Sequence, residues 1–266
     1  MLRFIVYTRG RTGSSAICDE LNNHPEITCH GEIYRSDPLA RGPIKAAWEQ
    51  YGRQYPKKIN SRDRVLPLRL HAELSAEAEV TPEAFAAYYD YLATEAEAES
   101  SKAVGGKSLT NHLDQAELLR NCVRTGVSVV SLRRRNFLRQ SVSAQVAQET
   151  GIYNRTRYQP EEGRKFTIDP KKVHSRIRAI NKHYADLDEA LAQAGVTCIT
   201  VYYEDWLTDR AAFFTKMSAF LGVADALPEN TVFSRTTPEP LSDLLEKYDE
   251  FVEGIRRAGF EEYLTE

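Results

Sequence analysis

A short run of β-prone residues, Phe4 to Tyr7, passes directly into a glycine-rich turn at residues 9–15, and a helical segment starts at Ser14. Two glycines in the turn let the backbone bend tightly and direct its N–H groups toward one point. The N-terminus of the following helix adds partial positive charge. Arg11 adds a full charge, so the segment predicts an anion-binding loop. An ordinary strand–helix turn is the alternative that this segment alone leaves open.

Strand and helix patterns continue to alternate beyond this turn. Further β-prone runs cover residues 127–132 and 196–203, and helical patterns cover 136–149, the stretch from Asp169, and 209–221. Such alternation predicts the α/β class, with a central parallel sheet flanked by helices. Residues 37–100 interrupt the alternation and predict a helical insertion or lid. Residues 151–169 predict a long exposed loop.

Composition restricts the class of protein. The chain has 266 residues, 42% of them apolar and 27% charged, so we expect one globular domain over 1–266. A net charge of −3 does not favour general nucleic-acid binding. The four cysteines form no CxxC pair, no His, Cys and acidic residues cluster at ligand spacing, and no apolar run reaches membrane-helix length. We therefore expect a cytoplasmic protein without a metal, a transmembrane segment or a nucleic-acid partner.

Neither glycine-rich stretch fits the phosphate loop of nucleoside triphosphatases. That loop requires a lysine directly after its last glycine. Here Gly13 is followed by Ser14, and the Gly106-Lys107-Ser108 sequence has Ser101 where the first glycine should stand. The sequence therefore disfavours nucleoside triphosphate hydrolysis.

A second basic cluster follows the strand predicted at 127–132. Four arginines lie between residues 133 and 139, at the start of a predicted helix, where they oppose the helix dipole. The carboxyl ends of parallel strands are also where open α/β sheets bind ligands. Arg135 and Ser143 are eight residues apart and could grip one phosphate, but Arg133 and Ser141 have the same spacing. Which of these two arginine–serine pairs forms the second anion site stays open.

With these residues in view, the sequence resembles the sulfotransferases that use 3′-phosphoadenosine 5′-phosphosulfate (PAPS). The turn resembles the family's 5′-phosphosulfate loop, and Arg135 with Ser143 resembles its 3′-phosphate motif. Residues 201–207 and 220–223 resemble its YEDL and FLGV segments, and residues 24–34 and 140–153 resemble bacterial nodulation and trehalose sulfotransferases. The loop residues concerned are Arg9, Gly10, Arg11, Thr12, Gly13, Ser14 and Ser15.

The resemblance implies a P-loop-like three-layer fold and specific roles. It implies PAPS as the donor, with PAP as product, and a carbohydrate or glycolipid hydroxyl as the acceptor. Glu32 would be the general base, with His30 as its rival, and Arg11 would stabilise charge on the leaving phosphate. Lys107 could reach the sulfate or the acceptor, and Arg235 resembles a second 3′-phosphate contact. The acceptor pocket would come from residues 33–70 and 151–168.

Two other functions remain to be distinguished from this one. A P-loop kinase-like phosphotransferase would bind Mg-ATP, and a non-catalytic nucleotide-binding protein of the same fold would bind PAP without turnover. The closer resemblance indicates a bacterial source. A monomer and a homodimer are both compatible with the sequence.

Overall fold

The computed structural model describes residues 1–33, 82–98, 100–110, 113, 115–153, 164–233, 237 and 240–265. Its centre is a sheet of five parallel strands in the order β2-β3-β1-β4-β5. The strands are β1 (Leu2–Thr8), β2 (Ile27–Glu32), β3 (Ala103–Leu109), β4 (Ser128–Arg133) and β5 (Cys198–Tyr202). The predicted α/β class with a central parallel sheet is confirmed.

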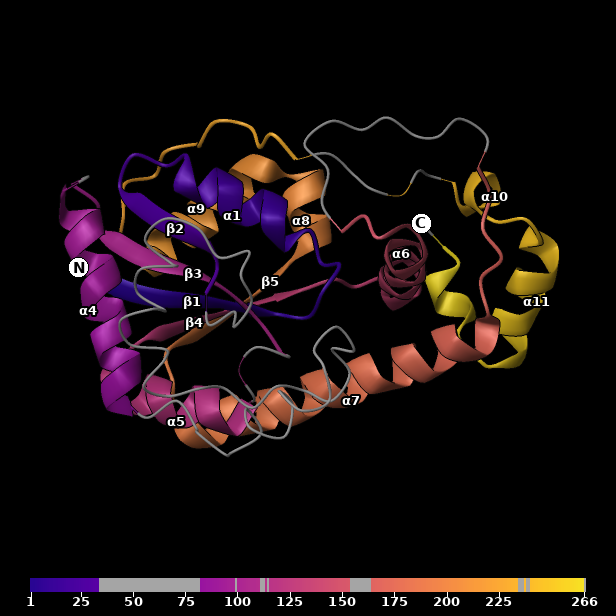
Figure 1. The fold of residues 1–266 in the computed structure, drawn as a ribbon, viewed down its shortest axis with the longest axis horizontal. Helices are drawn as coiled ribbons and strands as arrows, with labels where there is room; N and C mark the ends of the chain where they lie inside the picture. The colour runs from indigo at the N-terminus through magenta and orange to yellow at the C-terminus, as the bar shows by residue number, and fades with distance from the viewer. Residues whose placement is uncertain are drawn as a thin grey trace, which may run out of the picture.

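Helices cover both faces of the sheet (Figure 1). One face packs against α1 (Ser14–Asn22) and α9 (Arg210–Leu221), with the short α8 (Tyr203–Thr208) beside them. The other face packs against α4 (Pro82–Ala98), α5 (Gln115–Thr125) and α7 (Pro170–Ala194). Alternate residues of β1 supply the two cores, because side chains in a strand point to opposite faces. Ile5 and Tyr7 enter the α4–α5–α7 core, and Phe4 and Val6 enter the α1–α9 core.

Helix α4 belongs to the core layer of the protein. Phe85, Tyr88, Tyr89 and Leu92 are at most 1% exposed, and the Tyr89 hydroxyl donates to the Phe4 carbonyl at 2.8 Å. These residues lie at i, i+3, i+4 and i+7, the spacing of one helix face. Part of the stretch that we predicted as an insertion over 37–100 therefore forms one layer against the sheet. The rest of that stretch, up to residue 81, lies outside the described residues.

A third core joins the C-terminal helices to the rest. It packs α6 (Phe137–Thr150) and the first half of α7 against α10 (Leu241–Leu244) and α11 (Tyr248–Arg257). Phe166 pairs with this part: its N–H donates to the Leu244 carbonyl at 2.8 Å, and its carbonyl accepts from Glu246 N at 3.2 Å. Phe166 and Ile168 are 6% and 7% exposed, so the prediction of an exposed loop over 151–169 is wrong for these two residues, although the residues around them are exposed. Burial against α10 and α11 is the reason.

Two further expectations concern the end of the last strand and the absence of a membrane-spanning helix. The strand expected at 196–203 ends at Tyr202, and α8 begins at the next residue. Among the described residues, no helix has both the length and the apolar character needed to cross a bilayer.

The buried carboxylate of Glu20 offers a test of the α1 packing. It accepts hydrogen bonds from Trp206 Nε1 at 2.8 Å, Arg210 Nε at 2.9 Å and Thr231 N at 3.0 Å, and its side chain is 2% exposed. Glu20→Ala should lower the free energy of unfolding by about 3 kcal/mol, because it leaves Arg210 without its counter-charge. Chemical denaturation measures this.

Asp186→Ala is the matched control, because it removes an exposed ion pair with Lys182 on α7. We expect Asp186→Ala to lower the free energy of unfolding by less than about 0.5 kcal/mol. Similar small losses in both variants would show that the Glu20 cluster does not hold α1 in place.

Candidate active site

The glycine-rich turn has the backbone conformation of a tight loop between β1 and α1. Arg11 and Gly13 have positive φ angles of 71° and 73°. A Cβ atom on Gly13 would lie 2.3 Å from Cδ2 of Tyr203, so the ring of Tyr203 occupies the space of any side chain. The carbonyl of Gly13 accepts from Ala16 N at 3.0 Å, which starts α1 directly after the turn. The N–H groups at the start of this helix give the loop its capacity to bind an anion.

Threonine hydroxyls fix the loop from within. Thr8 Oγ1 lies 2.7 Å from Thr12 Oγ1 and donates to the Leu132 carbonyl of β4 at 2.7 Å. Thr12 is fully buried, so its hydroxyl supports the loop from inside. From α6, Gln140 Nε2 donates to the Gly10 carbonyl at 2.9 Å. The loop is therefore attached to β4 and α6 as well as to its own strand and helix.

Arg11 extends from the loop toward α6. Its Nε donates to Ser143 Oγ at 3.1 Å, and its Nη1 donates to the carbonyl of Tyr153. The pKa of Arg11 is lowered to about 10, mainly by burial and in second place by the positive charge of Arg134. Arg11 is still a cation at neutral pH, but one with little solvent around it. Binding an anion here would replace the lost solvation.

The arginines after β4 have different environments. Arg133 is tied to the core: its Nη1 donates to Asp188 Oδ2 at 2.8 Å, its Nε donates to Ser131 Oγ at 3.0 Å, and it lies over the Tyr184 ring. Ser141 Oγ donates to the Phe137 carbonyl at 2.7 Å. Arg133 and Ser141 are thus engaged within the protein, in separate contacts.

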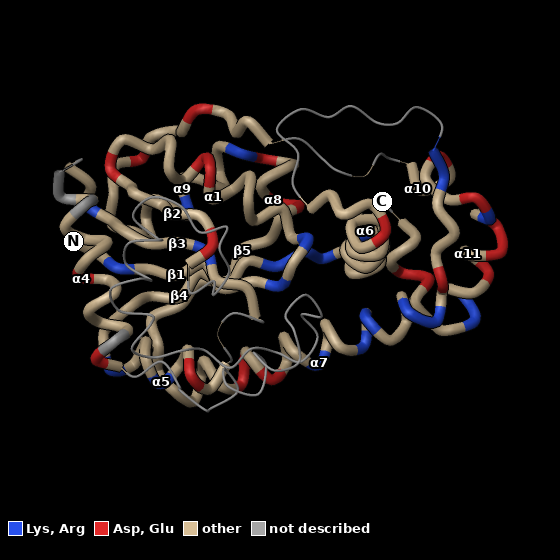
Figure 2. Tube along the Cα trace, in the orientation of Figure 1, with Lys and Arg blue, Asp and Glu red and all other residues tan. Residues whose placement is uncertain are grey.

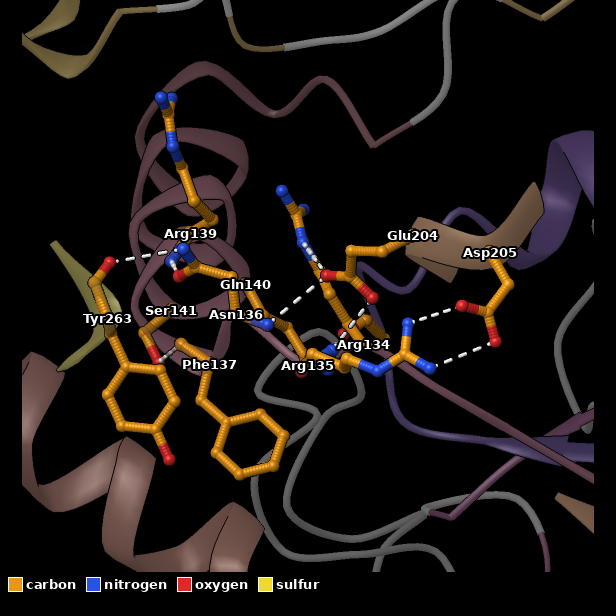
Figure 3. A network of polar contacts seen from close by, with 11 residues as sticks. Arg134, Arg135, Asn136, Phe137, Arg139, Gln140, Ser141, Glu204, Asp205 and Tyr263 are labelled. Atoms are coloured by element: carbon orange, nitrogen blue, oxygen red, sulfur yellow. Dashed lines mark hydrogen bonds and ion pairs between the residues drawn. The ribbon is translucent and has the colours of Figure 1, made fainter. Parts of the chain in front are cut away.

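Arg135 points toward α8, away from α6 (Figure 3). It binds the carboxylate of Asp205 through both terminal nitrogens, at 2.5 and 3.0 Å, and lies 4.1 Å from the centre of the Tyr202 ring. Its side chain is half exposed. The structure therefore brings Ser143 to Arg11 and does not bring it to Arg135.

Glu204 and Asn136 shape the turn that leads from β4 into α6. The carboxylate of Glu204 accepts from the backbone N–H groups of Arg135 at 2.9 Å and Asn136 at 3.2 Å. Asn136 caps α6 by accepting from Arg139 N at 2.9 Å. Arg134 lies 5.0 Å from the centre of the Tyr203 ring, and its Nε is 3.8 Å from Glu204. Arg134, which stands between Arg133 and Arg135, is therefore a site residue that the spacing to a serine did not reveal.

Glu32 and Lys107 form an ion pair at the ends of β2 and β3. Lys107 Nζ lies 3.1 Å from Glu32 Oε1 and donates to Ser15 Oγ at 3.0 Å. The Lys107 side chain is only 5% exposed and that of Glu32 is 18% exposed. A register shift between His30 and Glu32 sets Glu32 beside Lys107. One lysine thus links the candidate base to the anion-binding loop.

The remaining predicted site residues are placed as follows. Ser14 is buried at the first position of α1, and Ser15 follows it beside Lys107. Arg9 reaches toward α7, where its Nη1 lies 3.4 Å from the Ala179 carbonyl. Arg235 lies outside the described residues. In the part of the chain that the structure describes, no three His, Cys, Asp or Glu residues come together as a metal site, and the expected absence of a metal stays a prediction.

Basic residues gather where the strands of the sheet end (Figure 2). The N–H groups at the start of α1, Arg11, Ser14 and Ser15 are the hydrogen-bond donors of the loop, and Lys107 connects Ser15 to the carboxylate of Glu32. This arrangement can bind an anionic group at the loop and remove a proton from a neighbouring hydroxyl.

Comparison with known proteins gives a family and a fold. The model of the sulfotransferase family matches residues 4–226. A sulfotransferase from Alicyclobacillus acidocaldarius has a similar structure, with a TM-score of 0.52 and 14% identity, over 99% of this chain and 96% of that one. The sulfotransferase domain of the curacin biosynthetic pathway aligns with a TM-score of 0.48 and 11% identity, over 96% and 98%. No curated protein matches the sequence.

Gly13→Ala tests the close contact in the loop. The added Cβ would meet the Tyr203 ring in a backbone conformation that alanine rarely adopts. We expect the free energy of unfolding to fall by at least about 2 kcal/mol. Denaturant titration measures the loss.

Gly10→Ala is the control within the same loop, because a Cβ there meets nothing within 4 Å. We expect a change of less than about 1 kcal/mol. Equal stability of the two variants would mean that Tyr203 does not confine the turn.

Proposed function

The chain belongs to the sulfotransferase family, and we propose that it transfers a sulfuryl group from PAPS to a hydroxyl of a carbohydrate or glycolipid. One observation carries this proposal: Lys107 bridges the carboxylate of Glu32 and Ser15 of an anion-binding loop that has no phosphate-loop lysine. A carboxylate base and an anion site that are connected through one lysine suit transfer from an anionic donor to a hydroxyl.

The loop residues fit the 5′ end of PAPS. The donor set consists of N–H groups at the start of α1, the hydroxyls of Ser14 and Ser15, and the desolvated guanidinium of Arg11. Arg9, Gly10, Thr12 and Gly13 complete the loop. When bound, PAPS supplies an activated sulfuryl group whose leaving group is the 5′-phosphate of PAP. Arg11 would stabilise the negative charge that develops on that phosphate.

Arg135 and Ser143 are proposed to hold the 3′-phosphate, with Arg235 as a further contact. Arg135 would have to leave Asp205 for the phosphate. Its ion pair with Asp205 is half exposed, and such pairs contribute only about 0–1 kcal/mol, so the exchange costs little. Arg134, close to Arg11, adds a cation on the same side. A 3′-phosphate contact selects PAPS over ATP, which has no phosphate at that position.

Glu32 is proposed as the general base. It would take the proton of the acceptor hydroxyl while Lys107 holds its carboxylate near the loop. A sulfuryl group carries less negative charge than a γ-phosphoryl group, so the cations of the loop can replace a metal clamp. We therefore propose transfer without a metal.

The nature of the acceptor rests on the resemblance of residues 24–34 and 140–153 to nodulation and trehalose sulfotransferases. The same resemblance supports a bacterial source. Scattered cysteines support a cytoplasmic location.

Calorimetric titration with PAP, and with Mg-ATP in parallel, tests the donor. We expect PAP to bind much more tightly than Mg-ATP. Arg135→Ala and Ser143→Ala should each weaken PAP binding, the arginine by about tenfold or more, because a charge-assisted hydrogen bond is lost. Arg124→Ala, an exposed arginine of α5, is the control and should leave PAP binding unchanged.

The outcomes separate the three functions. Binding of Mg-ATP in place of PAP would indicate a phosphotransferase. Binding of PAP without sulfuryl transfer to any member of a sugar and glycolipid panel would indicate a non-catalytic protein.

Glu32→Gln tests the base. The amide keeps the shape of the side chain but cannot accept the proton, so kcat should fall by about 10²–10⁴-fold. PAP affinity should change by less than about twofold, because the loop cations remain. Transfer from labelled PAPS to the best acceptor of the panel measures kcat.

Glu26→Gln is the matched control, because Glu26 is an acid that precedes the same strand and pairs with Lys102. Its kcat should equal that of the wild type. Wild-type turnover in the Glu32 variant would show that the base is another residue.

A further inference from the structure

Arg9 and Arg176 bring two positive charges together between the loop and α7. Arg9 leaves the loop toward α7 and donates to the carbonyl of Ala179. Arg176 lies one turn earlier on the same helix, and both side chains are half-buried. Burial lowers the pKa of Arg176, and the charge of Arg9 lowers it further. The pKa of Arg9 is also lowered by burial, and the groups that oppose this are the tyrosines Tyr184 and Tyr7.

No carboxylate balances this pair within the described residues. Neither arginine forms an ion pair with Asp or Glu there, whereas Arg133 nearby is bound to Asp188. Arg176 Nε is buried without a hydrogen-bond partner, and so is His183 Nε2, two turns further on the same face of α7. Two partly desolvated cations without a counter-charge are unfavourable. The arrangement is accounted for if an anion binds between them.

The charge pattern of α7 agrees with this conclusion. Its first half carries five cations and no acid, and its acids follow in the second half (Figure 2). Cations near a helix N-terminus oppose the helix dipole. Helix stability therefore does not explain why Arg176 stands there. The residues concerned are Lys171, Lys172, Arg176, Arg178 and Lys182 on one side and Asp186, Asp188 and Glu189 on the other.

We propose that Arg9 and Arg176 bind an anionic group of the acceptor: a carboxylate, a sulfate or a phosphate. The inference rests on the proposed sulfuryl transfer and narrows the acceptor to an acidic carbohydrate or glycolipid. Arg11 donates to Ser143 of α6, whereas Arg9 donates to the carbonyl of Ala179 in α7. The charge of Arg176 also lowers the pKa of Arg11, so the acceptor site would lie beside the donor site. A neutral acceptor would bring no counter-charge to the two arginines, which have no carboxylate partner among the described residues, and this gives the enzyme a way to reject it.

Binding of inorganic sulfate to the PAP-saturated protein tests this site. PAP occupies the donor contacts, and calorimetry measures sulfate affinity. Arg176→Ala and Arg176→Met should each raise the Kd of sulfate by about tenfold or more, and should change the Kd of PAP by less than about twofold. Arg178→Ala, an exposed arginine on the same helix, is the control and should change neither.

The second readout is thermal unfolding in buffer without multivalent anions. Arg176→Met keeps much of the side-chain length and removes one of two repelling charges, so its Tm should equal or exceed that of the wild type. A lower Tm would show that Arg176 serves stability, and would overturn the proposal.

Two binding results would also overturn it. Unchanged sulfate affinity in both Arg176 variants would show that the pair binds no anion. If the Arg176 variants lost as much affinity for PAP as for sulfate, the anion that Arg176 binds would be a phosphate of the donor. Failure of the wild type to bind PAP would reject the proposed function, while sulfate titration of the free protein would still test Arg9 and Arg176.

Discussion

The close approach of Gly13 to the ring of Tyr203 determines how the ends of three strands meet. Gly13 ends the turn after β1, and Tyr203 begins α8 directly after β5. The next residue, Glu204, accepts from the backbone after β4. A side chain on residue 13 would separate these segments. Glycine at this position is therefore required for the contact between the anion-binding loop, the β4–α6 turn and the start of α8.

Local patterns in the sequence predicted the parts of the fold that local physics controls. The helix that we predicted from Asp169 begins there: Asp169 caps α7 by accepting from Lys171 N at 2.9 Å, and Pro170 stands in its first turn. The spacing of Phe85, Tyr88, Tyr89 and Leu92 was also visible in the sequence. It could have identified α4 as a core helix, but residues 37–100 interrupt the alternation of strands and helices, and this led to their interpretation as an insertion or lid.

The partners of the arginines could not be predicted, because they lie far away in the sequence. Arg133 and Arg135 have the same spacing to a serine, and only the fold shows that Asp188 engages one and Asp205 the other. Arg11 and Ser143 are 132 residues apart. Arg176 gives no local signal, since one arginine on a basic helix resembles any solvated residue. The structure shows a carboxylate bound to Arg133 and another bound to Arg135, and in the described part of the chain it shows none bound to Arg176.

The length of α7 has a mechanical consequence. Its 25 residues form one continuous helix. The second half of this helix packs against the sheet, and the first half extends beyond the sheet to α11 (Figure 1). Arg133 binds Asp188 of this helix, twelve residues from Arg176. At 1.5 Å per residue that lever arm is about 18 Å, so a tilt of about 5° moves Arg176 by about 1.6 Å. The C-terminal helices pack against the first half of α7, so in the proposed site their packing would set the separation between Arg176 and the loop.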